Sequence, residues 1–261
     1  MYPAMCQLPC KTTQRTTMSN TEDKPYRITT DSGYRKYLCG GYYMPSVTTV
    51  LSATETEKSK AGLRNWQAAN PGALEAASKR GSAIHKCAED YLRGLPINCP
   101  PDYQDFWNGM SDYLEWFEEI HWSERPLRSD WYHLRSDDKE VSYVWSTEHL
   151  YAGCPDLIGE IGGVKVIADF KTSNGPYMNR FPDKGDRMGF GGWRKYLKCA
   201  QQMAAYRLAL EERTGYKCDV GLIIVSTEKE TQAIFIDSDQ MDLNEARFLK
   251  RAEQFHAAES E

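Results

Sequence analysis

The second half of the chain alternates between short apolar runs and longer amphipathic stretches. Runs rich in β-branched residues predict strands, at Val141–Thr147, Tyr151–Ile161, Val164–Phe170, Val220–Ser226 and Gln232–Asp237. Helical periodicity predicts two helices, at Trp193–Thr214, which Gly215 would close, and at Met241–Ala258. This order of strands and helices is typical of an α/β domain with a mixed central sheet flanked by helices.

The first half of the chain has mostly helical patterning. Tyr42–Leu51 predicts a short strand or turn that leads into a helix. Further helices are predicted at Leu63–Ala69, Ala73–Leu92 and Asp102–His121, with a break at Asn70-Pro71-Gly72. Residues 1–24 indicate a disordered polar tail. We therefore expect one domain over residues 25–261, mainly helical over 25–126 and carrying the sheet over 127–261.

Composition narrows the class of protein. The 261 residues are 41% hydrophobic and 26% charged, which is ordinary for a globular chain. The net charge of −5 means that any site for a polyanion must be a local patch. Eight cysteines occur without a CxxC pair, so neither a zinc ribbon nor an iron–sulfur cluster is indicated.

No apolar run approaches the ~20 residues of a membrane span, so no membrane partner is expected. The first 21 residues contain Lys11 and Arg15 but no acidic residue, a faint resemblance to an organellar transit peptide. A cytoplasmic location is our first expectation and a mitochondrial one the alternative.

Candidate chemistry gathers at the end of one predicted strand. Asp169 and Lys171 would point to the same side of the strand, while Phe170 between them faces the core. Asp156 precedes Asp169 by thirteen residues, and a hairpin turn at Gly162-Gly163 would place the two carboxylates side by side. Neighbouring carboxylates favour a cation between them, and hard oxygen ligands suit Mg²⁺ or Mn²⁺.

Alone, an Asp-x-Lys tripeptide is more typical of a surface salt bridge, but the surrounding motifs change this interpretation. Gly153-Cys154-Pro155-Asp156 followed by Asp169-Phe170-Lys171 resembles the core of the PD-(D/E)XK nucleases. Gln202-Met203-Ala204-Ala205-Tyr206 and Gly81-Ser82-Ala83-Ile84-His85 are similar to two helix motifs of their RecB-like branch. Tyr42–Leu51 and Leu63-x-x-Trp66 further resemble mitochondrial genome maintenance exonucleases and related phage exonucleases. Four weak motifs in one order make a specific signal.

The resemblance implies roles for individual residues. Catalytic roles would belong to Asp156, Asp169, Lys171, Gln202 and Tyr206. A Mg²⁺ or Mn²⁺ ion would be held by His85, Asp156, Asp169 and the backbone carbonyl of Phe170. The alternatives are a core histidine at position 85, and an amphipathic helix in which Gln202 and Tyr206 have no special task. Some RecB-branch relatives hold an iron–sulfur cluster through C-terminal cysteines; none follows Cys218 here, so no cluster is expected.

Three glutamates are candidates for supporting positions. Glu89 follows His85 by one helical turn and would orient it or belong to the nucleic-acid interface. Glu140 falls close to where the family often has a strand glutamate, and Glu148 competes for that position.

A glycine-rich basic loop is predicted from Thr172 to about Gly192. Between Thr172 and Lys198 the chain carries six basic and two acidic residues, and several aromatic ones. Such a loop beside a metal site could hold phosphates and stack on unpaired bases. The candidate DNA contacts in it are Arg180, Lys184, Arg187, Trp193, Arg194, Lys195 and Lys198.

No pattern for base-edge recognition is present. Together with the resemblance, this predicts a DNA exonuclease that acts on ends, prefers single strands and reads little sequence. A phage replication or recombination role is the favoured setting. The rival hypotheses are a structure-selective endonuclease on the same core, a nucleic-acid-binding module without activity and, ranked lowest, an enzyme acting on RNA.

Overall fold

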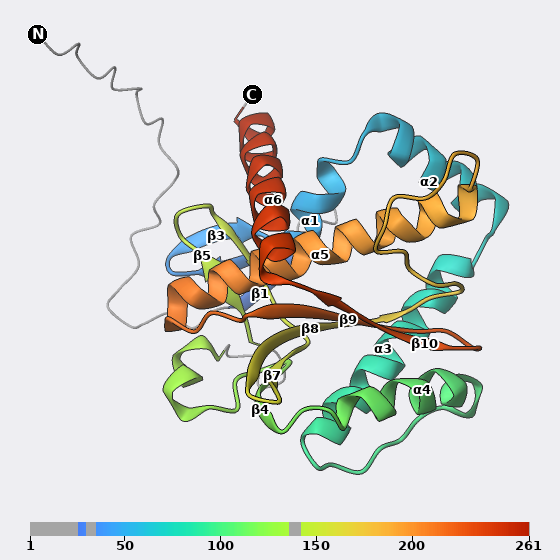
Figure 1. The fold of residues 1–261 in the computed structure, drawn as a ribbon. Coiled ribbons are helices and arrows are strands. Elements are labelled where there is room, and N and C mark those ends of the chain that lie inside the picture. Colours follow the sequence, from blue (N-terminus) through green and yellow to red (C-terminus); the bar gives the residue numbers. More distant parts are fainter. Residues whose placement is uncertain (1–25, 30–34, 136–141, 261) are drawn as a thin grey trace, which may run out of the picture.

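A five-stranded mixed sheet forms the centre of the computed structural model, which describes residues 26–29, 35–135 and 142–260 (Figure 1). The strand order is β10-β9-β8-β7-β4, and only the β8–β9 pair is parallel. The strands are β4 (Glu119–Ser123), β7 (Leu157–Ile161), β8 (Val164–Thr172), β9 (Val220–Ser226) and β10 (Thr231–Ile236). The predicted α/β class with a mixed central sheet is confirmed.

Helices cover both faces of this sheet (Figure 1). One face carries α5 (Arg187–Thr214) and α6 (Ser238–Glu259), and the other carries α3 (Ala73–Leu92) and α4 (Gln104–Leu114). Alternation along β8 produces this layering: Val166, Ala168 and Phe170 enter the core beneath α3 and α4, whereas Ile167 enters the core beneath α5. A strand buried on both faces is nearly continuous in apolar residues, as β9 is and as β8 is over Val166–Ala168.

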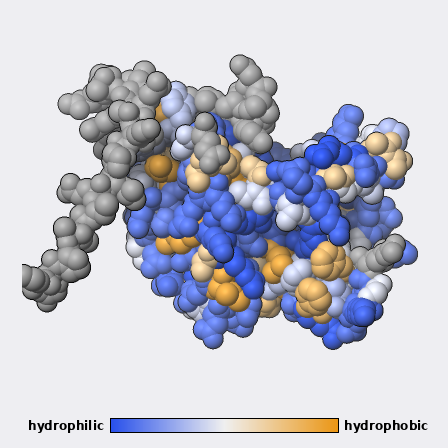
Figure 2. Space-filling view, turned by 90° about the horizontal axis from the view of Figure 1, so that it is seen from above, coloured by the Kyte–Doolittle hydropathy of each residue, from blue (hydrophilic) through white to orange (hydrophobic). Residues whose placement is uncertain are grey.

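Smaller elements flank the central sheet. A three-stranded sheet consists of β1 (Tyr26–Thr29), β2 (Arg35–Cys39) and β3 (Tyr42–Pro45), and a two-stranded one of β5 (Val144–Ser146) and β6 (Tyr151–Gly153). The helices α1 (Val47–Ala53) and α2 (Glu57–Ala69) lead into α3, and 3₁₀ turns lie at Pro101–Tyr103 and Ser129–Leu134. Seen from above, apolar side chains form separate patches among hydrophilic ones (Figure 2).

The predicted turn between β7 and β8 is present. Gly162 and Gly163 have φ values of 57° and 74°, the left-handed backbone that a two-residue hairpin turn requires and that glycine adopts without strain. Leu157 pairs with Ala168 in the hairpin, so the next position along each strand places Asp156 opposite Asp169.

The helix predicted over Asp102–His121 is too long. It ends at Leu114, and Glu119–Ser123 forms β4, the edge strand that pairs with β7. His121, Trp122 and Ser123 are all buried there, because tertiary packing against the sheet overrides the local helical pattern. The central sheet therefore takes one strand from the part expected to be mainly helical.

Two further boundaries differ from the sequence prediction. The strand predicted over Tyr151–Ile161 is divided between two sheets at Cys154–Asp156, where Pro155 cannot donate a backbone hydrogen bond. The predicted loop ends early, because α5 already begins at Arg187: the side chain of Asp186 accepts a hydrogen bond from the Gly189 backbone N–H (2.7 Å) and caps the helix.

The predicted tail at residues 1–24 lies outside the described residues. Among the residues that the structure describes, no helix has the length and apolar character needed to cross a bilayer.

Candidate active site

Two buried carboxylates mark the end of the β7–β8 hairpin. Asp156 lies one residue before β7, and its Oδ2 accepts the backbone N–H of Phe170 at 2.7 Å. Asp169 lies opposite, within β8, and is 1% exposed. The carboxylate positions are therefore fixed by the backbone of a short, rigid hairpin.

Lys171 and Gln202 bind the Asp169 carboxylate. Lys171 lies two residues along β8, on the same side of the strand, and forms an ion pair with Asp169 Oδ2. Gln202, on α5, donates to Asp169 Oδ1 at 2.9 Å. Burial raises the pKa of Asp169 to about 6, although Lys171 opposes this shift. Burial disfavours the charged Lys171 ammonium, yet Asp169 and Asp156 hold its pKa well above the usual value.

Tyr206 supports this arrangement from one turn further along α5. Its hydroxyl accepts a hydrogen bond from Gln202 Nε2 at 3.3 Å. Its ring packs over Gly153 so closely that a Cβ at position 153 would lie 2.3 Å from Tyr206 Cε1. A residue with a side chain therefore cannot replace Gly153 without moving the tyrosine.

His85 reaches the hairpin from α3. Its Nε2 donates to the Phe170 carbonyl at 2.9 Å, since a carbonyl oxygen can only accept. Its Nδ1 lies 3.5 Å from Asp156 Oδ1 and 3.7 Å from Glu124 Oε1. Although burial disfavours the charged ring, Asp156 and Glu124 raise the pKa of His85 to about 10. Once Nδ1 loses its proton, its lone pair faces both carboxylates.

Glu124 is the site residue that the sequence interpretation missed. It follows β4 with a φ of 54°, unusual for a residue other than glycine, and its N–H donates to the Asp156 carbonyl at 3.1 Å. Cys154 Sγ donates to Glu124 Oε2 at 3.3 Å. The helix predicted over Asp102–His121 would place no strand end near Glu124. The sequence did offer one signal for a strand end here: apolar Trp122 is followed within four residues by Pro126.

The donor set fits a divalent cation. One nitrogen of His85 and one carboxylate oxygen each of Glu124 and Asp156 lie within 4.8 Å of one another. Two carboxylates with one imidazole suit Mn²⁺ and Mg²⁺ better than a thiolate-seeking metal. Of the four predicted ligands, His85 and Asp156 belong to this group. Asp169 is bound by Lys171 and Gln202, and the Phe170 carbonyl accepts the His85 hydrogen bond.

The other predicted glutamates lie differently. The Glu89 carboxylate is bound by Lys86 on the same helix and by Arg93, the residue that follows it. Glu140 lies outside the described residues. Glu148 belongs to a separate surface group with His149 and Glu212.

The predicted DNA contacts divide into paired and unpaired cations. Arg194 is paired with Glu55, whereas Lys198 donates to the neutral Ser52 Oγ and Lys195 to Ser173 Oγ. Arg180 and Lys184 are exposed, and Arg187 is the first residue of α5. Trp193 packs edge-on against Phe181, which is 67% exposed, and Phe190 lies beside both rings.

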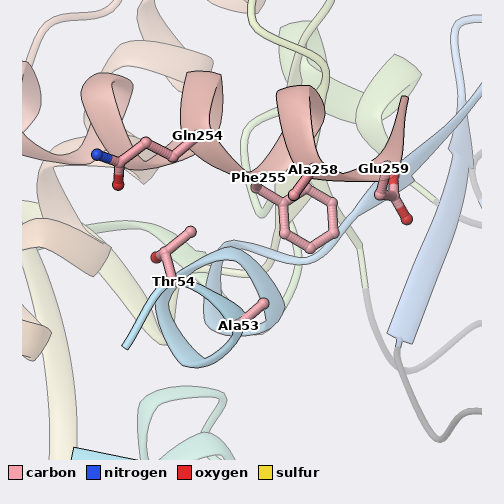
Figure 3. A pocket seen from close by; sticks show the side chains of 6 residues that line it. All are labelled: Ala53, Thr54, Gln254, Phe255, Ala258 and Glu259. Atoms are coloured by element: carbon pink, nitrogen blue, oxygen red, sulfur yellow. The ribbon is translucent and has the colours of Figure 1, made fainter. Parts of the chain in front are cut away.

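Two other features hold no comparable chemistry. A hollow between the end of α1 and the last turns of α6 is lined by small, apolar and neutral polar side chains together with Glu259 (Figure 3). His121 Nε2 lies 3.2 Å from Glu160 Oε1, and the Tyr216 hydroxyl also donates to this oxygen. The Glu160 carboxylate therefore already has protein partners.

Comparisons with known proteins gave a family match and similar solved structures. Residues 57–261 match the family model of the PD-(D/E)XK nuclease superfamily. The chain is similar to the crystal structure of SSO0001, with 18% identity, a TM-score of 0.24, and coverage of 40% of this chain but only 39% of that one. It is also similar to a protein from Eubacterium rectale, provisionally named an exonuclease, with 12% identity, a TM-score of 0.35 and coverage of 67% and 68%. Among curated proteins, none matches.

Proposed function

Because the chain belongs to the PD-(D/E)XK nuclease superfamily, we propose that it is a divalent-metal-dependent deoxyribonuclease that acts on DNA ends and prefers single strands. The observation that carries this proposal is the meeting of Asp156, Asp169 and Lys171 at one end of the hairpin, with His85 and Glu124 beside them. Nucleases of this superfamily use divalent metal ions, and these residues supply the donors.

The residues would divide the work as follows. Asp156, His85 and Glu124 would hold the ion, with Asp169 and the Phe170 carbonyl next to it. A bound Mg²⁺ or Mn²⁺ lowers the pKa of coordinated water and polarises a phosphoryl oxygen. Lys171, held in place by Asp169, would orient the attacking water and stabilise the negative charge that develops on the phosphate. Gln202 would keep Asp169 in position.

The preference for single strands is supported by exposed aromatic residues. Phe181 and Phe190 are 67% and 42% exposed and lie against Trp193, close in sequence to Arg180 and Lys184. Aromatic rings beside cations can stack on unpaired bases of any sequence while the cations bind phosphates. The requirement for an end rests on the resemblance of Tyr42–Leu51 and Leu63-x-x-Trp66 to exonucleases, as does a role in phage DNA replication or recombination.

One experiment tests the activity. End-labelled linear single-stranded DNA and closed circular single-stranded DNA are incubated with the protein in Mg²⁺, Mn²⁺ or EDTA. Metal-dependent loss of the linear DNA alone is expected, and the labelled end then reports the direction of digestion. Equal cutting of the circular DNA would show that the protein is an endonuclease and not an exonuclease. Asp169→Ala and Lys171→Ala are the inactive controls; binding without cutting by the unaltered protein would contradict an enzymatic function.

A further inference from the structure

Helix α3 lies against the end of β8, and two of its side chains contact two positions there (Figure 1). His85 on α3 contacts the carbonyl of Phe170, within the active-site strand. Five residues earlier on the helix, Arg80 Nη2 donates to Asn174 Oδ1 at 3.0 Å, just beyond the strand. On an α-helix, five residues correspond to about 7.5 Å along the axis. This is close to the separation of consecutive phosphates along an extended single strand.

Arg80 is held in place without a counter-charge. Its guanidinium lies 4.6 Å from the centre of the Phe106 ring, which restricts the plane of the group. Among the residues that the structure describes, its buried Nε has no hydrogen-bond partner, and the guanidinium donates one hydrogen bond, to the neutral Asn174 amide. Burying an unsatisfied donor on a cation costs free energy, so a purely structural link would be expected to use a carboxylate or a neutral donor.

A second cation lies next to it. Lys195, on α5, donates to Ser173 Oγ at 3.0 Å, and Ser173 immediately precedes Asn174. Burial and the nearby Arg80 lower the pKa of Lys195. In the part of the chain that the structure describes, no carboxylate forms an ion pair with Arg80 or Lys195. Two like charges have thus been brought from opposite faces of the sheet to consecutive residues.

We infer that Arg80 and Lys195 bind the phosphate that neighbours the scissile one, with Ser173 and Asn174 between them. This inference rests on the proposed function, because Lys171 and the candidate metal site define where the scissile phosphate lies. The two cations repel each other until a phosphate binds between them, so DNA binding relieves an unfavourable interaction. An arginine guanidinium and a lysine ammonium together bind the phosphate through its charge, whatever the neighbouring base is.

The test removes the negative charge from one phosphate at a time. Oligothymidylates that carry a single neutral methylphosphonate, placed at each linkage in turn, are titrated with the full chain in EDTA, where no cutting occurs. For the unaltered protein, the neutral linkage beside the scissile one should weaken binding roughly tenfold, as expected for a lost bond to a charged group. In Arg80→Gln, Lys195→Gln and the double variant, a methylphosphonate at this linkage should weaken binding only slightly. Methylphosphonates at the other linkages should weaken binding as they do for the unaltered protein.

The matched control is Lys79→Gln. Lys79 is the neighbour of Arg80 on α3, but it is exposed and already paired with Glu75, so the full methylphosphonate effect should persist. Retention of the full effect at that linkage in Lys195→Gln, which replaces the ammonium by a neutral polar group, would overturn the inference. So would an unaltered protein that is insensitive at every linkage. Cutting of unmodified DNA in Mn²⁺ is measured separately, so a failure of the proposed activity would be visible independently of this binding result.

Discussion

Gln202 joins Asp169 to Tyr206: its Nε2 lies 2.9 Å from Asp169 Oδ1 and 3.3 Å from the Tyr206 hydroxyl. All three side chains are buried. A helix residue therefore fixes the orientation of a carboxylate on a strand. We expect such a residue to affect catalysis through Asp169 without touching the substrate.

Replacing Gln202 should slow DNA cutting without unfolding the protein. Gln202→Met preserves the length of the side chain but leaves Asp169 Oδ1 without its donor. The rate in saturating Mn²⁺ should fall by about 10- to 100-fold, the usual effect of losing a residue that orients a metal-site carboxylate. Gln201→Met is the matched control, because Gln201 contacts Arg251 instead. Similar losses in both variants would indicate a general effect on α5.

Lys171→Met should both abolish cutting and destabilise the fold. It leaves the buried Asp169 carboxylate without its cation, which costs about 3 kcal/mol or more. Adding Asp169→Asn to this variant should restore much of the stability but none of the activity. Urea unfolding in EDTA measures the stability of both variants, and digestion of labelled DNA in Mn²⁺ measures their activity. The exposed Lys229→Met serves as the control, and an equal loss of stability there would contradict the argument.

Glu124 should contribute to metal binding and Glu148 should not. Glu124→Gln removes one carboxylate from the group with His85 and Asp156. Its Mn²⁺ affinity, measured by calorimetry, should fall about tenfold or more, and the Mn²⁺-induced rise in melting temperature should shrink accordingly. Glu148→Gln should bind Mn²⁺ like the unaltered protein. If Glu148→Gln instead lost more Mn²⁺ affinity than Glu124→Gln, Glu148 would be the residue that corresponds to the family's strand glutamate.

Gly153→Ala should be poorly tolerated because of Tyr206. The added Cβ would lie 2.3 Å from the tyrosine ring, and forcing the two apart should cost about 1–3 kcal/mol of stability. Gly191→Ala is the contrast: this helical glycine has nothing within 4 Å of the added atom, so the change should be neutral or stabilising. Thermal unfolding of the two variants provides the comparison.

Phe181→Ala should weaken binding to single strands and leave duplex binding and stability nearly unchanged. Loss of one stacked base costs about 1–3 kcal/mol in comparable sites. Fluorescence titrations with oligothymidylate and with a hairpin duplex distinguish the two. Phe235→Ala, which removes another half-exposed ring, stacked on Trp116, should leave both affinities unchanged.

Much of the fold could be predicted because local signals and tertiary structure agree. The paired glycines 162 and 163 specify a tight turn, and the apolar, β-branched run after them predicts a buried strand. The opposition of Asp156 and Asp169 follows from these two features. The end of α5 was likewise predictable, since Gly215 adopts the left-handed conformation of a helix cap (φ 71°).

The remaining features depend on contacts between distant segments. Glu119–Ser123 becomes a strand only because β7 offers an unpaired edge, and Glu124 joins the site only through that pairing. Its backbone bond to Asp156 spans 32 residues of sequence, and no local pattern encodes it. Arg80 was overlooked for the same reason: its relation to Asn174 exists only once α3 lies against β8.

The two-glycine turn between β7 and β8 also determines which insertions the chain can accept. An extra residue inside this turn would leave both strands able to form, yet it would shift β7 against β8 by one position. Because successive side chains alternate between faces, Asp156 would then lose its place opposite Asp169 while the apolar residues of one strand turned toward the wrong core. Length variation among homologous chains should therefore be excluded from this connection.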